Sequence, residues 1–187
     1  PRMSTIQPES ATSPRGLYKA LAAHPSKKYL IGLQAGHLSA LSVSRDAPTP
    51  VEVSYLALSG TPSSIAVSPQ GLIHVCTGSS IQGYRLNEAT NTLAYAMNST
   101  SSLCSELRVS ADGRFLIMVS VSAAAWGVFE IVGTDYILRS ATAISGASSL
   151  AFSEDNRHIV VVSRSGNAVY RIRFNPANGA PSLPIAS

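Results

Sequence analysis

Side chains that could do chemistry are scattered through the 187-residue sequence rather than gathered in motifs. Of the four histidines, His24, His37, His74 and His158, no pair lies at metal-ligand spacing together with a carboxylate or thiol. No Gly-x-Ser-x-Gly segment marks a nucleophilic serine, and no glycine-rich phosphate loop occurs. We therefore predict no catalytic residue, no metal site and no cofactor.

The carboxylates and cysteines offer no clearer reactive group. Asp112, Glu154 and Asp155 fall in expected turns, where acidic side chains commonly support turn geometry, and we favour that role over an acid–base pair. The two cysteines, Cys76 and Cys104, are too few for a disulfide framework and match no metal-ligand spacing. We expect them to be buried free thiols.

The charge balance permits an acidic partner without requiring one. The net charge is +4, but charged residues make up only 13% of the chain, about half of the roughly 25% usual for soluble domains. Because no basic stripe alternates with aromatic residues, we do not expect a nucleic-acid surface. A surface poor in charge suits a subunit that is largely covered by protein partners.

The same sequence predicts a location. No stretch approaches the roughly 18 to 20 apolar residues that cross a bilayer, so no membrane span is expected. The first residues lack the charged start and apolar centre of a secretory signal. These features favour a soluble intracellular protein, cytoplasmic or nuclear.

A repeat organises most of the chain. Four segments share an apolar run, a small polar turn and a second apolar run, and their turns align at Pro25, Pro69, Ala111 and Glu154, every 42 to 44 residues. Before the turn, apolar and polar residues alternate, as in residues 64–68, which is the period of a β-strand. The repeat therefore indicates an all-β architecture.

Each repeat is predicted to supply four strands. The first alternates, the second is nearly continuously apolar, as expected for a strand covered on both faces, and the third and fourth are more polar. The second, third and fourth strands are predicted at 29–33, 38–43 and 51–58 in the first repeat, 72–76, 81–86 and 92–97 in the second, 115–121, 126–131 and 136–144 in the third, and 158–163, 168–174 and 182–186 in the fourth.

Four strands repeated at this interval are typical of the blades of a β-propeller. A β-sandwich also has many short strands, but it does not repeat one strand–turn–strand phrase four times. We predict an all-β propeller with four four-stranded blades, either a complete small ring or part of a larger ring. The blades are expected at 17–60, 61–102, 103–146 and 147–187, after a flexible tail at 1–16.

The turn phrases resemble those of known propellers. Residues 67–71 (VSPQG), 109–114 (VSADGR) and 152–157 (FSEDNR) are similar to the F-S-P-D-G-R phrase of the WD-repeat and lactonase-type (YVTN-like) groups. No Trp-Asp pair closes a third strand, because the only tryptophan, Trp126, is not followed by aspartate. The resemblance implies a propeller with degenerate repeats. It specifies no activity, and propellers of these families usually have more than four blades.

Loops on one rim are the best candidates for partner contact, because rigid blades present them together. A further polar face is expected on the last third strand. The seven residues predicted to bind a protein partner are His37, Ser79, Ser122, Arg164 and Asn167 on the loops, and Arg171 and Arg173 on the strand.

Two functions follow. The first is a non-enzymatic protein-interaction scaffold, a propeller subunit of a larger complex whose ring is formed or completed by another chain. The alternative is a lactonase-type propeller hydrolase with its site in the axial funnel, and it rests on fold analogy alone.

Overall fold

The computed structural model describes residues 17–44, 46 and 49–186, and every regular element in this part of the chain is a β-strand. The tail predicted at 1–16 lies outside the described residues. The strands form four separate antiparallel sheets, and strands adjacent in each sheet are consecutive in the sequence, apart from a short extra strand in the last sheet. The predicted architecture of four four-stranded blades is therefore confirmed.

The strand bounds follow the repeat closely. Blade one contains β1 (Ala20–Ala23), β2 (Tyr29–Gln34), β3 (His37–Ser42) and β4 (Val51–Ala57). Blade two contains β5 (Ser64–Val67), β6 (Leu72–Cys76), β7 (Gly78–Asn87) and β8 (Thr92–Cys104). Blade three contains β9 (Glu106–Val109), β10 (Phe115–Ser120), β11 (Ala125–Val132) and β12 (Asp135–Ala143). Blade four contains β13 (Ala147–Phe152), β14 (His158–Ser163), β15 (Ala168–Asn175), β16 (Ala180–Pro181) and β17 (Ile185–Ala186).

Two fourth strands differ from their predicted extents. In blade two, β8 continues seven residues past the predicted end because its second half pairs with the start of β7, Gly78 opposite Cys104. In blade four the predicted strand at 182–186 is replaced by two short strands, β16 before this range and β17 at its end, both paired with β15. Pro181 and Pro184 explain this division, because proline has no N–H to donate to a continuous ladder.

The turn phrase owes its composition to hairpin hydrogen bonds. In blade three, the backbone N–H of Phe115 donates to Ser110 Oγ (2.9 Å), and that hydroxyl donates to Asp112 Oδ1 (2.6 Å). Gly113 has a φ of +74°, a left-handed conformation that glycine adopts at low cost. Ser153 and Asp155 repeat the arrangement in blade four. The predicted turn role of Asp112 and Asp155 is confirmed.

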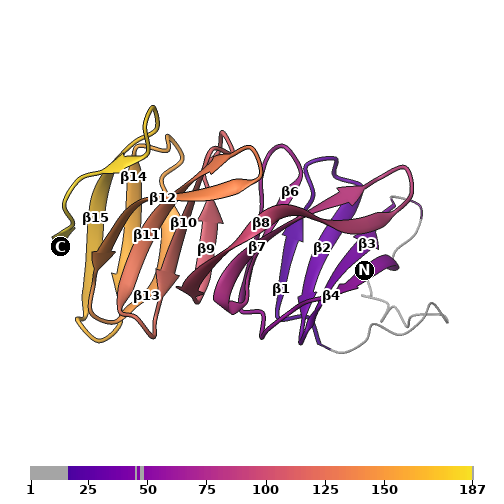
Figure 1. Cartoon of the computed structure of the whole chain (residues 1–187), viewed down its shortest axis with the longest axis horizontal. Helices are drawn as coiled ribbons and strands as arrows, with labels where there is room; N and C mark the ends of the chain where they lie inside the picture. Colours follow the sequence, from indigo (N-terminus) through magenta and orange to yellow (C-terminus); the bar gives the residue numbers. More distant parts are fainter. Residues whose placement is uncertain (1–16, 45, 47–48, 187) are drawn as a thin grey trace, which may run out of the picture.

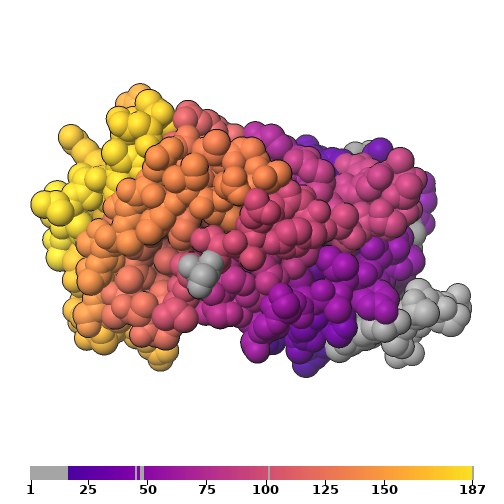
Figure 2. Space-filling model, viewed as in Figure 1, coloured from indigo at the N-terminus to yellow at the C-terminus, as the bar shows by residue number. Residues whose placement is uncertain are grey.

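The four blades are arranged in sequence order in an open arc. The first strands are neighbours, with β1 beside β5, β5 beside β9 and β9 beside β13. Blade one (indigo, right) and blade four (yellow, left) lie at opposite ends of the long axis in Figures 1 and 2. Each end of the arc therefore presents one face of a blade that no other described blade covers.

Three apolar cores fill the junctions between neighbouring blades. The first joins residues such as Ile31 and Leu33 to Ile73 and Val75, and equivalent cores join blades two and three, and blades three and four. The two middle sheets therefore contribute both of their faces to the cores, which explains why their second strands are almost entirely apolar, and the first and last sheets contribute one face each.

The middle junction also contains a disulfide. Cys76 at the end of β6 and Cys104 at the end of β8 are bonded, with their Cα atoms 5.6 Å apart, and both are buried. This corrects the expectation of two free thiols. The extension of β8 brings Cys104 beside the end of β6, and the sequence separation of 28 residues gives no sign of that pairing.

The junction between blades two and three also contains a buried, hydrogen-bonded pair of aromatic side chains. His74 Nδ1 on β6 lies 2.9 Å from the hydroxyl of Tyr136 on β12. Gly83 on β7 leaves room for this tyrosine, because a Cβ at that glycine would lie 2.7 Å from the Tyr136 hydroxyl. Burial lowers the pKa of His74 to about 3, so this histidine is neutral in the folded protein at neutral pH.

Candidate functional site

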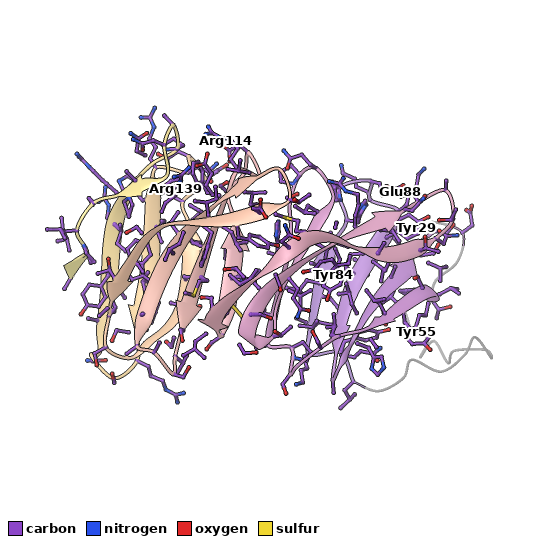
Figure 3. The ribbon with its side chains drawn as sticks, viewed as in Figure 1. Tyr29, Tyr55, Tyr84, Glu88, Arg114 and Arg139 are labelled. Carbon is purple, nitrogen blue, oxygen red and sulfur yellow. A yellow bond between two sulfur atoms is a disulfide. The ribbon has the colours of Figure 1, made fainter. Side chains whose placement is uncertain are left out.

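Five of the seven predicted contact residues lie at one rim of the arc. They follow the second strand of their own blade, and Tyr55, which contacts the His37 ring with centroids 5.8 Å apart, lies near this rim at the lower right in Figure 3. Arg114 and Glu88, which belong to the other set of hairpins, lie at the opposite rim. The five residues are His37, Ser79, Ser122, Arg164 and Asn167.

The side chains on this rim are spread over four blades and do not converge. Arg164 and Asn167 share the β14–β15 turn, whereas Ser122 lies in the β10–β11 turn, where its hydroxyl is 3.3 Å from that of Ser120. Ser79 lies within β7 rather than in a loop, because the blade-two turn is shorter than expected. Binding by this rim remains a prediction.

Arg171 and Arg173 belong to a different surface. Both are exposed on β15, and Arg173 is paired with His158, at the end of the sheet away from Arg164. A guanidinium nitrogen of Arg171 lies 3.0 Å from His158 Nε2. The two arginines line an open hollow together with Arg157, and no carboxylate is among the described residues that line it. The last blade therefore carries a basic surface.

This surface is the uncovered face of blade four. Residues directly opposite each other in an antiparallel pair point to the same face of the sheet. We name this surface the C-end face. By register, its side chains on β14, β15 and β17 are Val160, Val162, Val169, Arg171, Arg173 and Ile185.

The residues of the C-end face hold the same strand positions as residues that are buried between blades elsewhere, but they are exposed. At the end of the second strand, Leu33, Cys76 and Val119 are 0% exposed, whereas Val162 is 39% exposed. Their partners on the third strand show the same contrast, since Leu38, Ile81 and Trp126 are at most 1% exposed and Val169 is 43% exposed. Apolar positions that three blades bury therefore face outward in the fourth.

Arg171 is the exception within this register. The matching positions in the other blades hold Ala40, Gly83 and Val128, small or apolar residues that are buried against the next blade. A guanidinium there would need an anionic partner if it were covered, because an unpaired buried charge is strongly destabilising.

The opposite end of the arc also exposes an apolar residue at a position that the other blades bury. Leu21 on β1 is 55% exposed, whereas its equivalents Ile65, Leu107 and Leu150 are at most 7% exposed against the preceding blade. We name this surface the N-end face, and its residues include Tyr18, Leu21, Leu30, Ser39, Leu41 and Glu52.

The N-end face also carries polar groups, which are hydrogen-bonded to one another. The ring of Tyr18 lies over Gly32, where an added Cβ would be only 2.3 Å from the ring. Glu52 Oε2 accepts a hydrogen bond from Ser39 Oγ (3.0 Å) and lies 3.5 Å from the Tyr18 hydroxyl. A half-buried carboxylate is therefore fixed on this face by two hydroxyl groups.

The first strands of all four blades line an open groove on the inner side of the arc. Its hydroxyl groups are bonded to the backbone: Ser63 Oγ donates to the carbonyls of Cys76 and Cys104 (both 3.3 Å), and Ser105 Oγ accepts from the N–H of Val121 (3.0 Å). Glu106 and Arg108 form an ion pair within the groove. These serines connect strands rather than stand beside a general base.

The described residues contain neither a cluster of metal ligands nor a membrane-spanning helix. No group of three or more His, Cys, Asp or Glu side chains is placed to hold a metal ion within residues 17–44, 46 and 49–186. Over the same residues, no helix of sufficient length and apolarity for crossing a membrane is found.

Comparison with solved structures decides the fold. An uncharacterised protein from Desulfotomaculum acetoxidans matches over 89% of this chain with a TM-score of 0.78 and 16% identity, and a periplasmic gluconolactonase from Pseudomonas aeruginosa matches over 90% with 0.76 and 14%. The Cps50 (Swd1) β-propeller domain from Myceliophteria thermophila matches over 91% with 0.66 and 14%. This chain has a β-propeller fold. No protein-family model and no curated protein matches the sequence.

The propeller neighbours are much longer than the part they share with this chain. The matched region covers 54%, 53% and 60% of the three neighbours, so this chain spans about half to three-fifths of their length. At these identities the likeness extends to the fold alone. The neighbours include both a gluconolactonase and the Cps50 (Swd1) propeller domain, so they do not distinguish a scaffold from a lactonase.

The sequence prediction of contact residues included Arg171 and Arg173 but not the exposed apolar residues beside them. Val162, Val169 and Leu21 occupy positions that are apolar in every repeat, and such residues are normally assigned to a core. The signal was present in the arginine at position 171, where the aligned repeats hold alanine, glycine and valine.

Proposed function

We propose that this chain is a non-enzymatic interaction scaffold, a β-propeller subunit whose end faces bind protein and so extend the arc. One observation carries the proposal. Leu21, Val162 and Val169 hold the positions of buried junction residues and are 39 to 55% exposed. Exposed apolar surface rimmed by polar groups is characteristic of protein–protein interaction sites.

The free energy favours covering these faces. Burying a valine or leucine side chain contributes on the order of 1.5 to 3 kcal/mol relative to leaving it in water. The three equivalent junctions inside the arc show that such faces pack well against a neighbouring blade. A partner that presents a blade-like sheet would make the same contacts.

The lactonase-type alternative has less support in the described residues. A hydrolase of this kind would place its site in the axial groove, where the serine hydroxyls bond to the backbone and the charged pair Glu106–Arg108 is self-neutralising. Fold likeness alone does not transfer an activity.

Native mass spectrometry of the tagged chain recovered from its source extract tests the proposal. We expect a defined species heavier than the 19.5 kDa chain, which Val169→Asp dissociates and Ser122→Asp, on the rim, leaves intact. A 19.5 kDa species alone, together with hydrolysis of a lactone panel that depends on Glu106, would establish the alternative instead.

We also propose that the chain works in an oxidising compartment, in place of the intracellular location expected from the sequence. The Cys76–Cys104 disulfide supports this, because stable disulfides are rare in the cytosol and nucleus. Alkylation of intact source cells before lysis should leave both cysteines unlabelled until they are reduced. Complete labelling of both without reduction would restore the intracellular prediction.

A further inference from the structure

A short acceptor motif lies in the fourth strand of blade two. Asn98-Ser99-Thr100 is the only triplet in the sequence with asparagine first, serine or threonine third, and a residue other than proline between them. Such a triplet accepts an N-linked glycan when it lies at the surface of a protein that passes through a secretory compartment. Both conditions can be compared with the structure.

The motif coincides with a β-bulge that brings its asparagine to the surface. Where β8 passes Gln82 of β7, the register shifts, so that Asn98 and Ser99 both lie opposite this one residue. The backbone N–H of Asn98 donates to the carbonyl of Thr134 in blade three (2.8 Å). Met97, just before the bulge, is 2% exposed, whereas Asn98 and Ser99 are both exposed. The surface condition is therefore met.

Asn98 lies on the outer side of the arc. Its strand, β8, is at the opposite edge of the blade-two sheet from β5, and β5 lines the groove on the inner side. Blade two has a neighbouring blade on each side, so Asn98 belongs to neither the N-end face nor the C-end face. A group attached to Asn98 would leave the inner groove and both end faces free.

The side-chain amide of Asn98 can carry a glycan and keep its hydrogen bond. Asn98 Nδ2 donates to Asp135 Oδ1 at 2.6 Å. An amide nitrogen of this kind has two hydrogens, and N-glycosylation replaces one of them. The other hydrogen can still be donated to Asp135, which is exposed. The folded blade therefore accommodates the modified side chain without losing this contact.

The disulfide at the end of the same strand supports the second condition. β8 ends at Cys104, which is bonded to Cys76. Stable disulfides form in oxidising compartments such as the lumen of the endoplasmic reticulum, and N-linked glycans mark proteins of the same secretory route. The acceptor triplet and the disulfide are independent features, and both indicate this environment.

We propose that Asn98 is N-glycosylated. This inference rests on the oxidising compartment proposed above, and it adds a modification to the scaffold function. The donor is an oligosaccharide attached to a lipid pyrophosphate. A bond forms between Asn98 Nδ2 and C1 of the first sugar, the bond from C1 to the pyrophosphate oxygen breaks, the lipid pyrophosphate leaves with that electron pair, and the amide releases one proton. Because Asn98 lies within a strand, the transfer precedes the folding of blade two.

Intact-mass spectrometry of the denatured, tagged chain recovered from its source cells tests the proposal. Apart from the substitution itself, the wild-type chain should be heavier than Asn98→Gln by the mass of an oligosaccharide. Digestion of the wild-type chain with peptide N-glycosidase F should remove this difference and convert Asn98 to aspartate. Asn98→Gln should be unaffected by the digestion.

Variants at the other two positions separate the glycan from the hydrogen bond of Asn98. Thr100→Ala destroys the acceptor triplet but leaves Asn98 beside Asp135, so the added mass should be lost. Thr100→Ser and Ser99→Ala keep an accepted triplet and should retain the added mass. An added mass that survives Thr100→Ala, or that resists the glycosidase, would belong to another modification and would overturn the proposal.

The state of the cysteines shows which proposal fails. With cells alkylated before lysis, an unmodified Asn98 in a chain whose Cys76 and Cys104 are bonded would overturn the glycosylation and retain the oxidising compartment. An unmodified Asn98 in a chain whose two thiols are alkylated without reduction would overturn both. The denatured mass is independent of protein partners, so the scaffold function is tested separately by the native mass.

Discussion

At the scale of single residues, the junction between blades two and three depends on a buried hydrogen bond. Tyr136 and His74 come from different blades, and both are buried. A polar atom that loses its partner in such a site retains the full cost of its desolvation. Their bond therefore stabilises the position of one blade against the next.

Removing the Tyr136 hydroxyl should show this cost. Tyr136→Phe leaves His74 Nδ1 without its partner, so we expect the free energy of unfolding in urea to fall by about 1 to 3 kcal/mol. Tyr95→Phe is the matched control, because Tyr95 is 53% exposed, and its loss should be within about 0.5 kcal/mol. Equal losses in the two variants would show that the hydrogen bond has no special role.

The buried imidazole also predicts a pH dependence. The pKa of His74 is about 3 in the folded protein and near 6.5 when exposed, so between these values the unfolded state binds the extra proton. Stability should therefore fall as the pH is lowered from about 6.5 toward 3, by up to about 1.4 kcal/mol per pH unit from this group.

Urea titrations at several pH values measure this slope. His74→Met, which cannot be protonated, should reduce the slope of unfolding free energy against pH between pH 6 and 4. His37→Gln, on the rim, should reduce this slope less than His74→Met does. An unchanged slope in His74→Met would assign the acid sensitivity to other groups.

At the scale of elements, the disulfide fixes the long fourth strand of blade two. It joins the ends of β6 and β8, and the intervening β7 pairs with both strands. For a separation of 28 residues, the loss of unfolded-state entropy corresponds to about 3 to 4 kcal/mol of stability.

Reduction should therefore weaken the protein by a measurable amount. We expect dithiothreitol to lower the free energy of unfolding by about 3 kcal/mol. The double variant Cys76→Ala/Cys104→Ala should be destabilised to a similar extent and insensitive to the reductant. A wild-type protein that unfolds identically with and without dithiothreitol would contradict a stabilising role.

The elements were mostly predictable from the sequence, and the reasons are local. Turn residues such as Pro69, Asp112 and Gly113 mark each hairpin, and alternation or continuous apolarity marks the strands between them. The extension of β8 and the Cys76–Cys104 bond were not predictable, because they depend on pairing between segments whose own composition is neutral. The exposure of Val162 was also hidden, since an apolar residue gives no sign of whether a neighbour covers it.

At the scale of the whole molecule, the arc explains why a regular propeller sequence leaves apolar positions exposed. Each blade buries both faces only when it has a neighbour on each side, and the first and last described blades have one neighbour each. The two uncovered faces differ in charge, with Glu52 at one end and Arg171 with Arg173 at the other.

Counting blades in the assembled particle tests this account most directly. Electron-microscopy class averages viewed along the ring axis should show a closed ring with more than four blades. A closed ring of four blades, or an isolated arc as the stable species, would contradict the claim that the end faces are interfaces.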